Sequence, residues 1–221
     1  MIHQKKSYLF IVCFLLGILL CGCAHTDTEL KASDTTDQAT ERDYSYKTQM
    51  DIAMEHISDP KILAAVNDTN ITQVDVDLYS VDGEKHNVNE IVKYYVVTDY
   101  AEKNSLQMDA WCQELYNDIE EDMLNDQELS DDYCLTTYGI SKSEVIEYAK
   151  KRVYQIGMNS AFSNMVTNEV TSGETPQKHP ELKDAYEKFQ KDKFHNGSKA
   201  WAEIERAYYE MIAEDYDIVI Y

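Results

Sequence analysis

The chain has 221 residues, of which 43% are hydrophobic, which is enough for one domain of ordinary size together with a tail. Its 20 basic and 41 acidic residues give a formal net charge of -21. Nucleic acid is excluded as a partner, because phosphate binding needs clustered Lys and Arg. With only 7 glycines and 3 prolines, the composition also disfavours a turn-rich all-β fold.

An apolar segment near the start of the chain follows two lysines and runs from Tyr8 to Leu20. A positive start, an apolar run of this length and small residues at its end are typical of a secretory signal peptide. The alternative is a membrane-spanning helix, but even when extended to Ala24 the segment only just reaches the length that spans a bilayer. We therefore predict that residues 1–22 are a signal peptide.

The end of this segment indicates which kind of signal it is. Leu20-Cys21-Gly22-Cys23 resembles the bacterial lipobox, whose final cysteine is lipidated and becomes the first residue of the mature protein. The resemblance implies that a lipid on Cys23 anchors the chain to the extracytoplasmic face of the cell membrane. The protein is thus expected to be a lipoprotein.

The segment after the anchor is polar. Residues 24–50 are rich in Thr, Asp, Ser, Lys and Gln, a composition with too little apolar surface to form a core. We expect residues 23–57 to be a flexible tether and residues 58–221 to be the folded domain. Removal of residues 1–22 takes away two lysines and no acid, so the mature chain would carry 18 basic and 41 acidic residues, a net charge of -23.

The folded domain is predicted to begin with Ile62–Val66, a short apolar run that is typical of a buried strand. Residues 67–70 form a turn cluster. A short helix over residues 73–79 follows, with Thr72 and Asp75 spaced as an N-cap and its N3 acid. Three amphipathic helices are expected next, over residues 88–104 with Asn87 or Asn89 as the cap, over residues 109–125, and from Ser130 towards Tyr138.

The longest predicted element is a helix from Ser141 to about Val170. Gly139 suits a left-handed turn before it, and Ser141 and Glu144 have the spacing of a capping box. The helix carries two apolar stripes, so we expect it to pack on more than one side and to be the central element of the fold. The stripes are Ile146, Ala149, Val153 and Ile156, and Tyr154, Met158, Ala161 or Phe162, and Met165.

The C-terminal part is predicted to contain a break at residues 173–180, a helix that begins at Pro180 and a last helix capped by Ser198. Residues 216–221 are β-branched and aromatic, which favours a strand. A terminal strand needs a partner, and Ile62–Val66 is the other good candidate, so we expect the two to pair. The sequence thus predicts a mainly α fold with one long central helix and a small two-stranded pairing of the N- and C-terminal segments.

Several stretches, in this order and spacing, resemble SurA- and PrsA-type chaperone domains. Residues 65–72 resemble their strand and Val-Asn-Gly-x-x-Ile-Thr opening, with Asp68 at the usual glycine. Residues 101–106 resemble the helix end Ala-Glu-Lys-x-Gly-Ile, again with the glycine replaced. Further matches are the stretch Tyr-Gly-Ile-Ser-x-x-Glu at residues 138–144, the segment at 180–194, and the final helix and strand up to Tyr221.

The resemblance spans about Ile62 to Tyr221 and implies a SurA N-terminal-like helical domain that cradles unfolded polypeptide. In two-domain members, a parvulin-type prolyl isomerase domain would follow Phe194. Here only His195-Asn196-Gly197 separates the flanking helices, and the chain has no Gly-Gly parvulin signature. We therefore expect the chaperone scaffold without isomerase activity.

Reactive side chains form no catalytic or metal-binding pattern, so neither an enzyme activity nor a cofactor or metal is expected. An EF-hand needs a glycine at its sixth position and a glutamate at its twelfth, which no window of the acid-rich region 118–128 supplies, and a solvated acidic helix face is the interpretation. Cys112 and Cys134 could form a disulfide or be two small buried hydrophobic residues. The histidines of the mature chain are scattered, at His25, His56, His86, His179 and His195.

The chain has more aromatic residues than the apolar stripes require, including 17 tyrosines. A cleft lined by Tyr and Met could hold varied apolar segments, since these side chains adapt to different partners. The alternative is an ordinary core. The candidate peptide-binding residues are Tyr95, Trp111, Tyr154, Met158, Phe162, Trp201 and Tyr208.

From the sequence we expect a membrane-anchored extracytoplasmic chaperone of the holdase type, which binds unfolded or secreted polypeptides between the long helix and the C-terminal helices. Its negative charge would favour basic clients. The alternative is a surface lipoprotein that uses the same scaffold to bind one dedicated folded partner. A promiscuous chaperone should present a long apolar groove, whereas a dedicated binder should present a compact patch with a few anchors.

Overall fold

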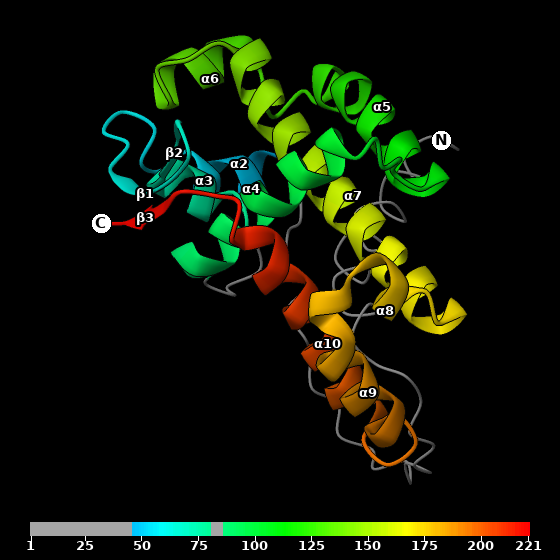
Figure 1. The fold of residues 1–221 in the computed structure, drawn as a ribbon. Coiled ribbons are helices and arrows are strands. Elements are labelled where there is room, and N and C mark those ends of the chain that lie inside the picture. The colour runs from blue at the N-terminus through cyan, green and yellow to red at the C-terminus, as the bar shows by residue number, and fades with distance from the viewer. Residues whose placement is uncertain (1–45, 81–85) are drawn as a thin grey trace, which may run out of the picture.

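A computed structural model describes residues 46–80 and 86–221 and shows a mainly helical protein with a small antiparallel sheet of three strands (Figure 1). The predicted signal peptide, the anchor residue Cys23 and the tether up to residue 45 lie outside the described residues. None of the described helices is both long and apolar enough to cross a membrane.

The predicted start of the folded domain at residue 58 is too late. Helix α2 (Tyr46–Ala53) lies within the predicted tether, yet Met50, Ala53 and the following Met54 are buried in the core. These three residues have the i, i+3, i+4 spacing of one helix face, so a single apolar stripe anchors a segment whose average composition is polar.

The sheet has β1 (Ile62–Val66) in the middle, β2 (Thr69–Thr72) on one side and β3 (Ile218–Ile220) on the other. The predicted pairing of the first strand with the C-terminal strand is therefore confirmed. The prediction of only two strands is wrong, because β2 forms where a turn cluster was expected. Asn67 adopts a left-handed φ of 50°, so the chain reverses at once and Thr69 already pairs with Val66.

The next helices begin close to the predicted positions. Helix α3 (Gln73–Asp77) follows Thr72, whose backbone N–H donates to the Asp75 carboxylate at 2.8 Å. Helix α4 (Val88–Lys103) is capped by Asn87 rather than Asn89, and it ends at Asn104 as expected. Helices α5 (Ala110–Asn125) and α6 (Asp131–Thr137) are capped by the side chains of Asp109 and Ser130.

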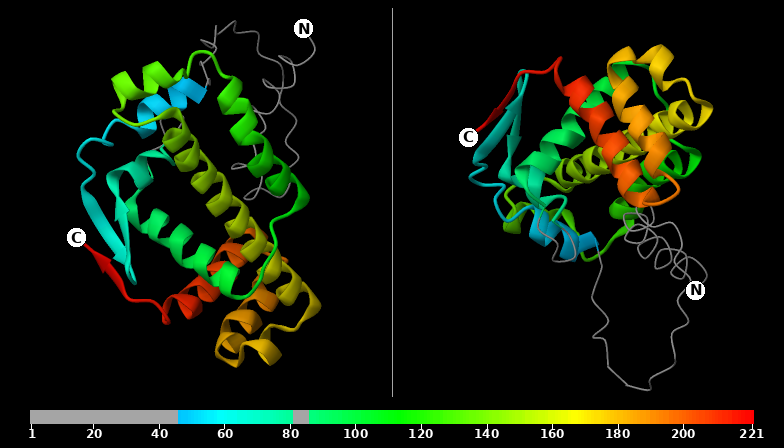
Figure 2. Two further views of the ribbon diagram at one scale, coloured as in Figure 1. Left: turned by 90° about the horizontal axis from the view of Figure 1, so that it is seen from above. Right: turned by 60° about the horizontal axis from the view of Figure 1, so that its bottom comes forward.

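Helix α7 (Lys142–Ser172) is the longest helix described and confirms the predicted central element. The Ser141 N–H donates to the Glu144 carboxylate at 2.8 Å, and Gly139 has a left-handed φ of 77°, as the capping pattern predicts. Figure 2 shows α7 crossing the molecule between α4 and α5, and it also contacts α6 and α10. Its two apolar stripes are thus covered from different sides.

The C-terminal elements differ from the prediction in detail. The expected break contains the short helix α8 (Thr175–Lys178), and Pro180–Leu182 forms a 3₁₀ turn, η2, before α9 (Lys183–Asp192). Helix α10 (Gly197–Ala213) begins after Asn196, earlier than a cap at Ser198 would place it. Helices α9 and α10 pack side by side in the lobe that extends away from α6 in Figure 1.

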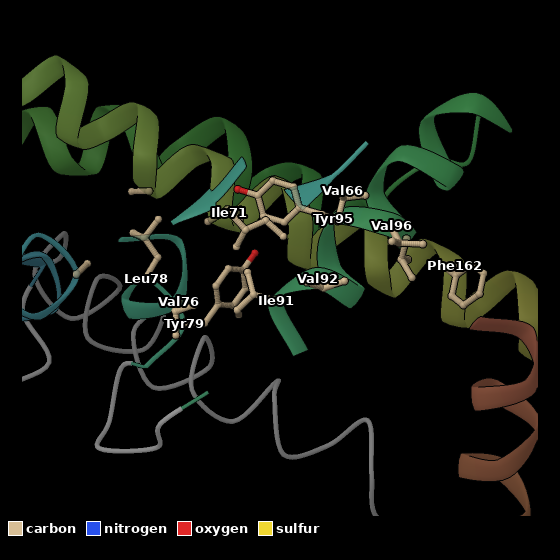
Figure 3. Close-up of a cluster of buried hydrophobic side chains, with 14 of the residues drawn as sticks. Val66, Ile71, Val76, Leu78, Tyr79, Ile91, Val92, Tyr95, Val96 and Phe162 are labelled. Atoms are coloured by element: carbon tan, nitrogen blue, oxygen red, sulfur yellow. The ribbon is translucent and has the colours of Figure 1, made fainter. Parts of the chain in front are cut away.

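The main core lies where α4 packs against β1 and α7. Figure 3 shows aliphatic residues of this core, including Val66, Ile71 and Ile91, around the rings of Tyr79 and Tyr95. Ile71 and Ile91 are fully buried, and each such side chain contributes about 1.5–3 kcal/mol relative to an exposed one. The sheet is therefore held on one face by the helices.

Candidate functional site

Four of the seven predicted peptide-binding residues belong to the core. Tyr95, Met158, Phe162 and Tyr208 are between 0% and 9% exposed, so their side chains do not line an open surface. Apolar residues at helical spacing more often belong to an ordinary core than to a cleft, and these four residues follow that alternative.

The other three predicted residues lie on separate parts of the surface. Trp111, at the start of α5, is 41% exposed. Tyr154 of α7 is half-buried beside Tyr116, with ring centroids 5.7 Å apart. Trp201 of α10 is half-buried against Phe189, at 4.7 Å. Tyr154 and Trp201 thus belong to two different aromatic pairs, on different helices.

Side-chain contacts join the long helix to the last helix, in the region where a cleft was expected. Tyr208 of α10 is fully buried, and its hydroxyl donates to the Glu169 carboxylate of α7 at 2.9 Å. Nearby, the Ser163 hydroxyl donates to Glu205 at 2.5 Å. The helices α7 and α10 thus contact each other directly through these side chains, and the location of a binding site between them stays a prediction.

Glu169 is the centre of a buried polar cluster that ties α7, α8 and α10 together. Besides the Tyr208 hydroxyl, Lys178 Nζ lies 3.2 Å and His179 Nε2 3.1 Å from its carboxylate oxygens. The Tyr208 hydroxyl also shares a hydrogen bond of 2.9 Å with Thr175. Burial, together with the Glu169 charge, raises the pKa of Tyr208. The donors around Glu169 satisfy the buried carboxylate, which indicates a structural brace.

A second buried carboxylate, Asp75, braces α3 against α4 and α7. It accepts hydrogen bonds from the Tyr95 hydroxyl at 2.6 Å and from Lys151 Nζ at 2.8 Å. Burial acts to raise the pKa of Asp75, but the Lys151 charge and the hydrogen bonds from Lys151, Tyr95 and Thr72 together lower it. Asp75 is therefore ionised and paired at neutral pH.

The remaining candidate groups are the acids, the histidines and the cysteines. Within residues 46–80 and 86–221, no three His, Cys, Asp or Glu side chains gather as a metal ion would require. Cys112 and Cys134 are both buried and form no disulfide with each other, which agrees with the second of the two alternatives, and burial raises the pKa of the Cys134 thiol. Most of the acid-rich stretch on α5 is exposed to solvent.

Exposed apolar side chains gather at the sheet. Around β1 and β3, the exposed fractions are 43% for Ile62, 40% for Val219, 47% for Ile220 and 74% for Tyr221. Other large exposed apolar residues are spread over separate elements: Ile52, Trp111, Leu124, Leu135 and Phe194. We call Ile62 and Ile218–Tyr221 the edge site.

The backbone of β3 has one paired and one open side. The Tyr221 N–H donates to the Leu63 carbonyl at 2.9 Å, and the Asn67 N–H donates to the Asp217 carbonyl at 2.7 Å. Because residues of an antiparallel strand alternate, the N–H and C=O groups of Ile218 and Ile220 point away from β1. Since β3 is an outer strand of the sheet, no described strand pairs with these groups (Figure 1).

The surroundings of the edge site are acidic. The last 15 residues contain four acids and no Lys, Arg or His, and Glu214, Asp215 and Asp217 are exposed. The nearby Lys103 is already engaged, because its Nζ lies 2.6 Å from the Asp99 carboxylate and 5.1 Å from the centre of the Tyr216 ring. The edge site thus combines apolar side chains with negative charge.

No protein-family model matches the chain, and no curated protein or solved structure matches it either. The functional assignment rests on the geometry of the edge site and on the sequence patterns.

The sequence predicts the strand, but Val219 and Ile220 are not among the predicted site residues. A signal was present, because the segment 216–221 has none of the lysines or prolines that usually protect the edge strand of a sheet.

Proposed function

We propose that this protein is a bacterial lipoprotein, anchored through Cys23 at the extracytoplasmic face of the membrane, that acts as a holdase for unfolded or secreted polypeptides. Its domain would be a SurA/PrsA-like chaperone domain without the parvulin isomerase domain. Binding without chemistry fits a surface on which apolar contacts are exposed and the buried carboxylates are satisfied by donors.

The observation that carries the proposal is the edge site. Val219, Ile220 and Tyr221 are between 40% and 74% exposed on consecutive residues, whereas a solitary exposed apolar residue would be unremarkable on any protein surface. A cluster of this kind suits an apolar segment that an unfolded chain exposes and a folded protein buries. The strongly acidic remainder of the domain would keep the loaded complex soluble.

One backbone conformation supports the resemblance to the chaperone domains. Ser105 has a left-handed φ of 55°, at the position where the resembling domains have glycine. The turn that carries Asp68 in place of glycine also contains a left-handed residue, Asn67. The Ser105 position thus has the backbone geometry that favours glycine, whereas the Asp68 position does not, because the left-handed residue of that turn is its neighbour Asn67.

The test is an aggregation assay with the chain from Ala24 onward, which retains every described residue. Several unrelated unfolded proteins would be mixed with it, and light scattering would be followed against a folded acidic protein of similar charge as the control. We expect suppression at near-stoichiometric ratios for several clients. If no client is protected, general chaperoning is refuted.

A second candidate function is the binding of one dedicated folded partner. It is favoured by the compactness of the edge site, which has a few anchors instead of a long groove. Cross-linking at the cell surface would separate the two candidates. A dedicated binder should give one partner in constant proportion, and a holdase should give many.

A further inference from the structure

We propose that the open edge of β3 binds an extended polypeptide segment as a fourth strand of the sheet, and that it selects segments in which basic and apolar residues alternate. This inference rests on the proposed function and assigns its client class and its mode of binding.

The backbone geometry supplies the first argument. The N–H and C=O groups of Ile218 and Ile220 point outward, so the strand offers two donors and two acceptors at the regular spacing of a ladder. An extended segment that pairs with them gains main-chain hydrogen bonds whatever its sequence. Main-chain recognition therefore allows a compact site to accept many clients, with no long groove.

The two faces of the strand supply the second argument. Ile218 and Ile220 pair with Val66 and Ala64, which are buried in the core, so they lie on the inner face of the sheet. Val219 pairs with Ala65 on the outer face and is 40% exposed. Side chains of an added strand would alternate between these faces. Those beside Ile218 and Ile220, of which Ile220 is 47% exposed, would meet apolar surface, and the others would lie on the outer face, which Val219 shares with Asp217 two residues before it.

The charge distribution supplies the third argument, and it also indicates which kind of chain would bind at the open edge of β3. Asp215 and Asp217 are exposed just before β3 begins, and none of the last 15 residues is Lys, Arg or His. A segment with Lys or Arg at alternate positions would find opposite charge there. A second copy of this chain is disfavoured as the occupant, because each copy carries a formal net charge of -21 and its own edge is equally acidic.

The edge also lacks the usual protection against pairing. Natural edge strands are commonly blocked by a lysine, a proline or a bulge. Residues 218–221 are Ile-Val-Ile-Tyr, which contains neither residue, and the pairing of β3 with β1 is regular over its whole length. An unprotected apolar edge on an otherwise highly charged protein fits a docking strand.

The test compares two substitutions at one position. Ile220→Pro removes an N–H that points to the open edge and makes no bond to β1, so the sheet should survive. Ile220→Val keeps the N–H and a β-branched apolar side chain and is the matched control. Binding would be measured by fluorescence anisotropy of a labelled peptide of alternating lysine and valine, with the chain from Ala24 onward.

We expect Ile220→Pro to weaken the binding of this peptide about tenfold, which corresponds to about 1.4 kcal/mol, and Ile220→Val to leave it within about twofold. A peptide with glutamate in place of each lysine should bind far more weakly, as should one with the same lysines and valines in two separate blocks. The double charge reversal Asp215→Lys with Asp217→Lys, at two exposed side chains, should reverse the preference between lysine and glutamate peptides.

The outcomes separate this inference from the proposed function. If Ile220→Pro binds the peptide as the wild type does, strand addition is wrong, while undiminished suppression of aggregation would leave the holdase function standing. If Ile220→Pro unfolds, the test is the charge-reversal variant. If that variant still prefers the lysine peptide to the glutamate peptide, the inference is overturned. A wild-type dimer that dissociates on the proline substitution would identify a second copy as the occupant and would likewise overturn it.

Discussion

The hydroxyl of Tyr208 should be a major contributor to the stability of the domain. Its side chain is fully buried and lies between α7 and α8, with hydrogen bonds of 2.9 Å to both Glu169 and Thr175. Tyr208→Phe keeps the ring and removes only the oxygen. Glu169 then retains Lys178 and His179, but it loses a donor while its side chain stays only 9% exposed.

The expected cost follows from the kind of bond that is lost. A hydrogen bond to a charged group contributes about 1.5–3 kcal/mol, and Thr175 would also lose a partner. The phenylalanine ring offsets part of this, because it no longer has to bury a hydroxyl. We therefore expect a loss of about 2 kcal/mol in the free energy of unfolding, or about 4–8 °C in melting temperature for a domain of this size.

The assay is urea unfolding of the wild type, Tyr208→Phe and the control Tyr209→Phe. Tyr209 is the next residue of the same helix, it is partly buried, and its hydroxyl has no hydrogen-bond partner among the described residues. The control should change the free energy of unfolding by less than about 0.5 kcal/mol. Equal losses in the two variants would refute the assignment of Glu169 and Tyr208 as a structural brace.

The remaining predictions concern pH, the backbone and the anchor. Burial raises the pKa of Tyr79 and Tyr95, so their contribution to stability is present below about pH 10 and is lost as the pH rises through the folded-state pKa values. The urea concentration at the midpoint of unfolding should therefore fall above about pH 10. The pKa of Asp75 is lowered, so its contribution to stability is present above about pH 4 and is lost as the pH falls through its folded-state pKa. Asp75→Asn should lower the free energy of unfolding by about 2 kcal/mol at pH 7 and should make that free energy depend less on pH in the acid range. A Cβ at Gly139 would have free space but a left-handed φ of 77°, so Gly139→Ala should cost about 1 kcal/mol in urea unfolding, whereas Ser105→Gly should be neutral or stabilising. Cys23→Ala should release the protein from the membrane fraction and abolish labelling with a radioactive fatty acid.

The helices could be predicted because their signals are local. Ser141 with Glu144, Asn87 with Glu90, and Asp109 each satisfy backbone groups within three residues, so a short window of sequence contains the whole interaction. The pairing of β1 with β3 could also be predicted, since a terminal strand requires a partner and few candidates existed.

The errors arose where the structure depends on contacts between distant residues. Helix α2 is held by burial of Met50 and Met54 in a core that its own polar sequence does not reveal. Strand β2 exists because Asn67 adopts a left-handed conformation and lets Thr69 pair with Val66.

The candidate site was the part that the sequence predicted least well. A tyrosine has the same pattern on a helix whether it faces a core or a cleft, so Tyr95 and Tyr208 could not be separated from exposed aromatic residues. The open edge of β3 depends on the order β2-β1-β3, which sequence periodicity does not encode.

The most direct test of the account is hydrogen exchange at the amides of Ile218 and Ile220, measured by NMR with and without an unfolded client. If clients are held as an added strand, both amides should become protected on binding, while the amide of Tyr221, already bonded to Leu63, should change little. Binding of a client that leaves the exchange of Ile218 and Ile220 unchanged would contradict the account.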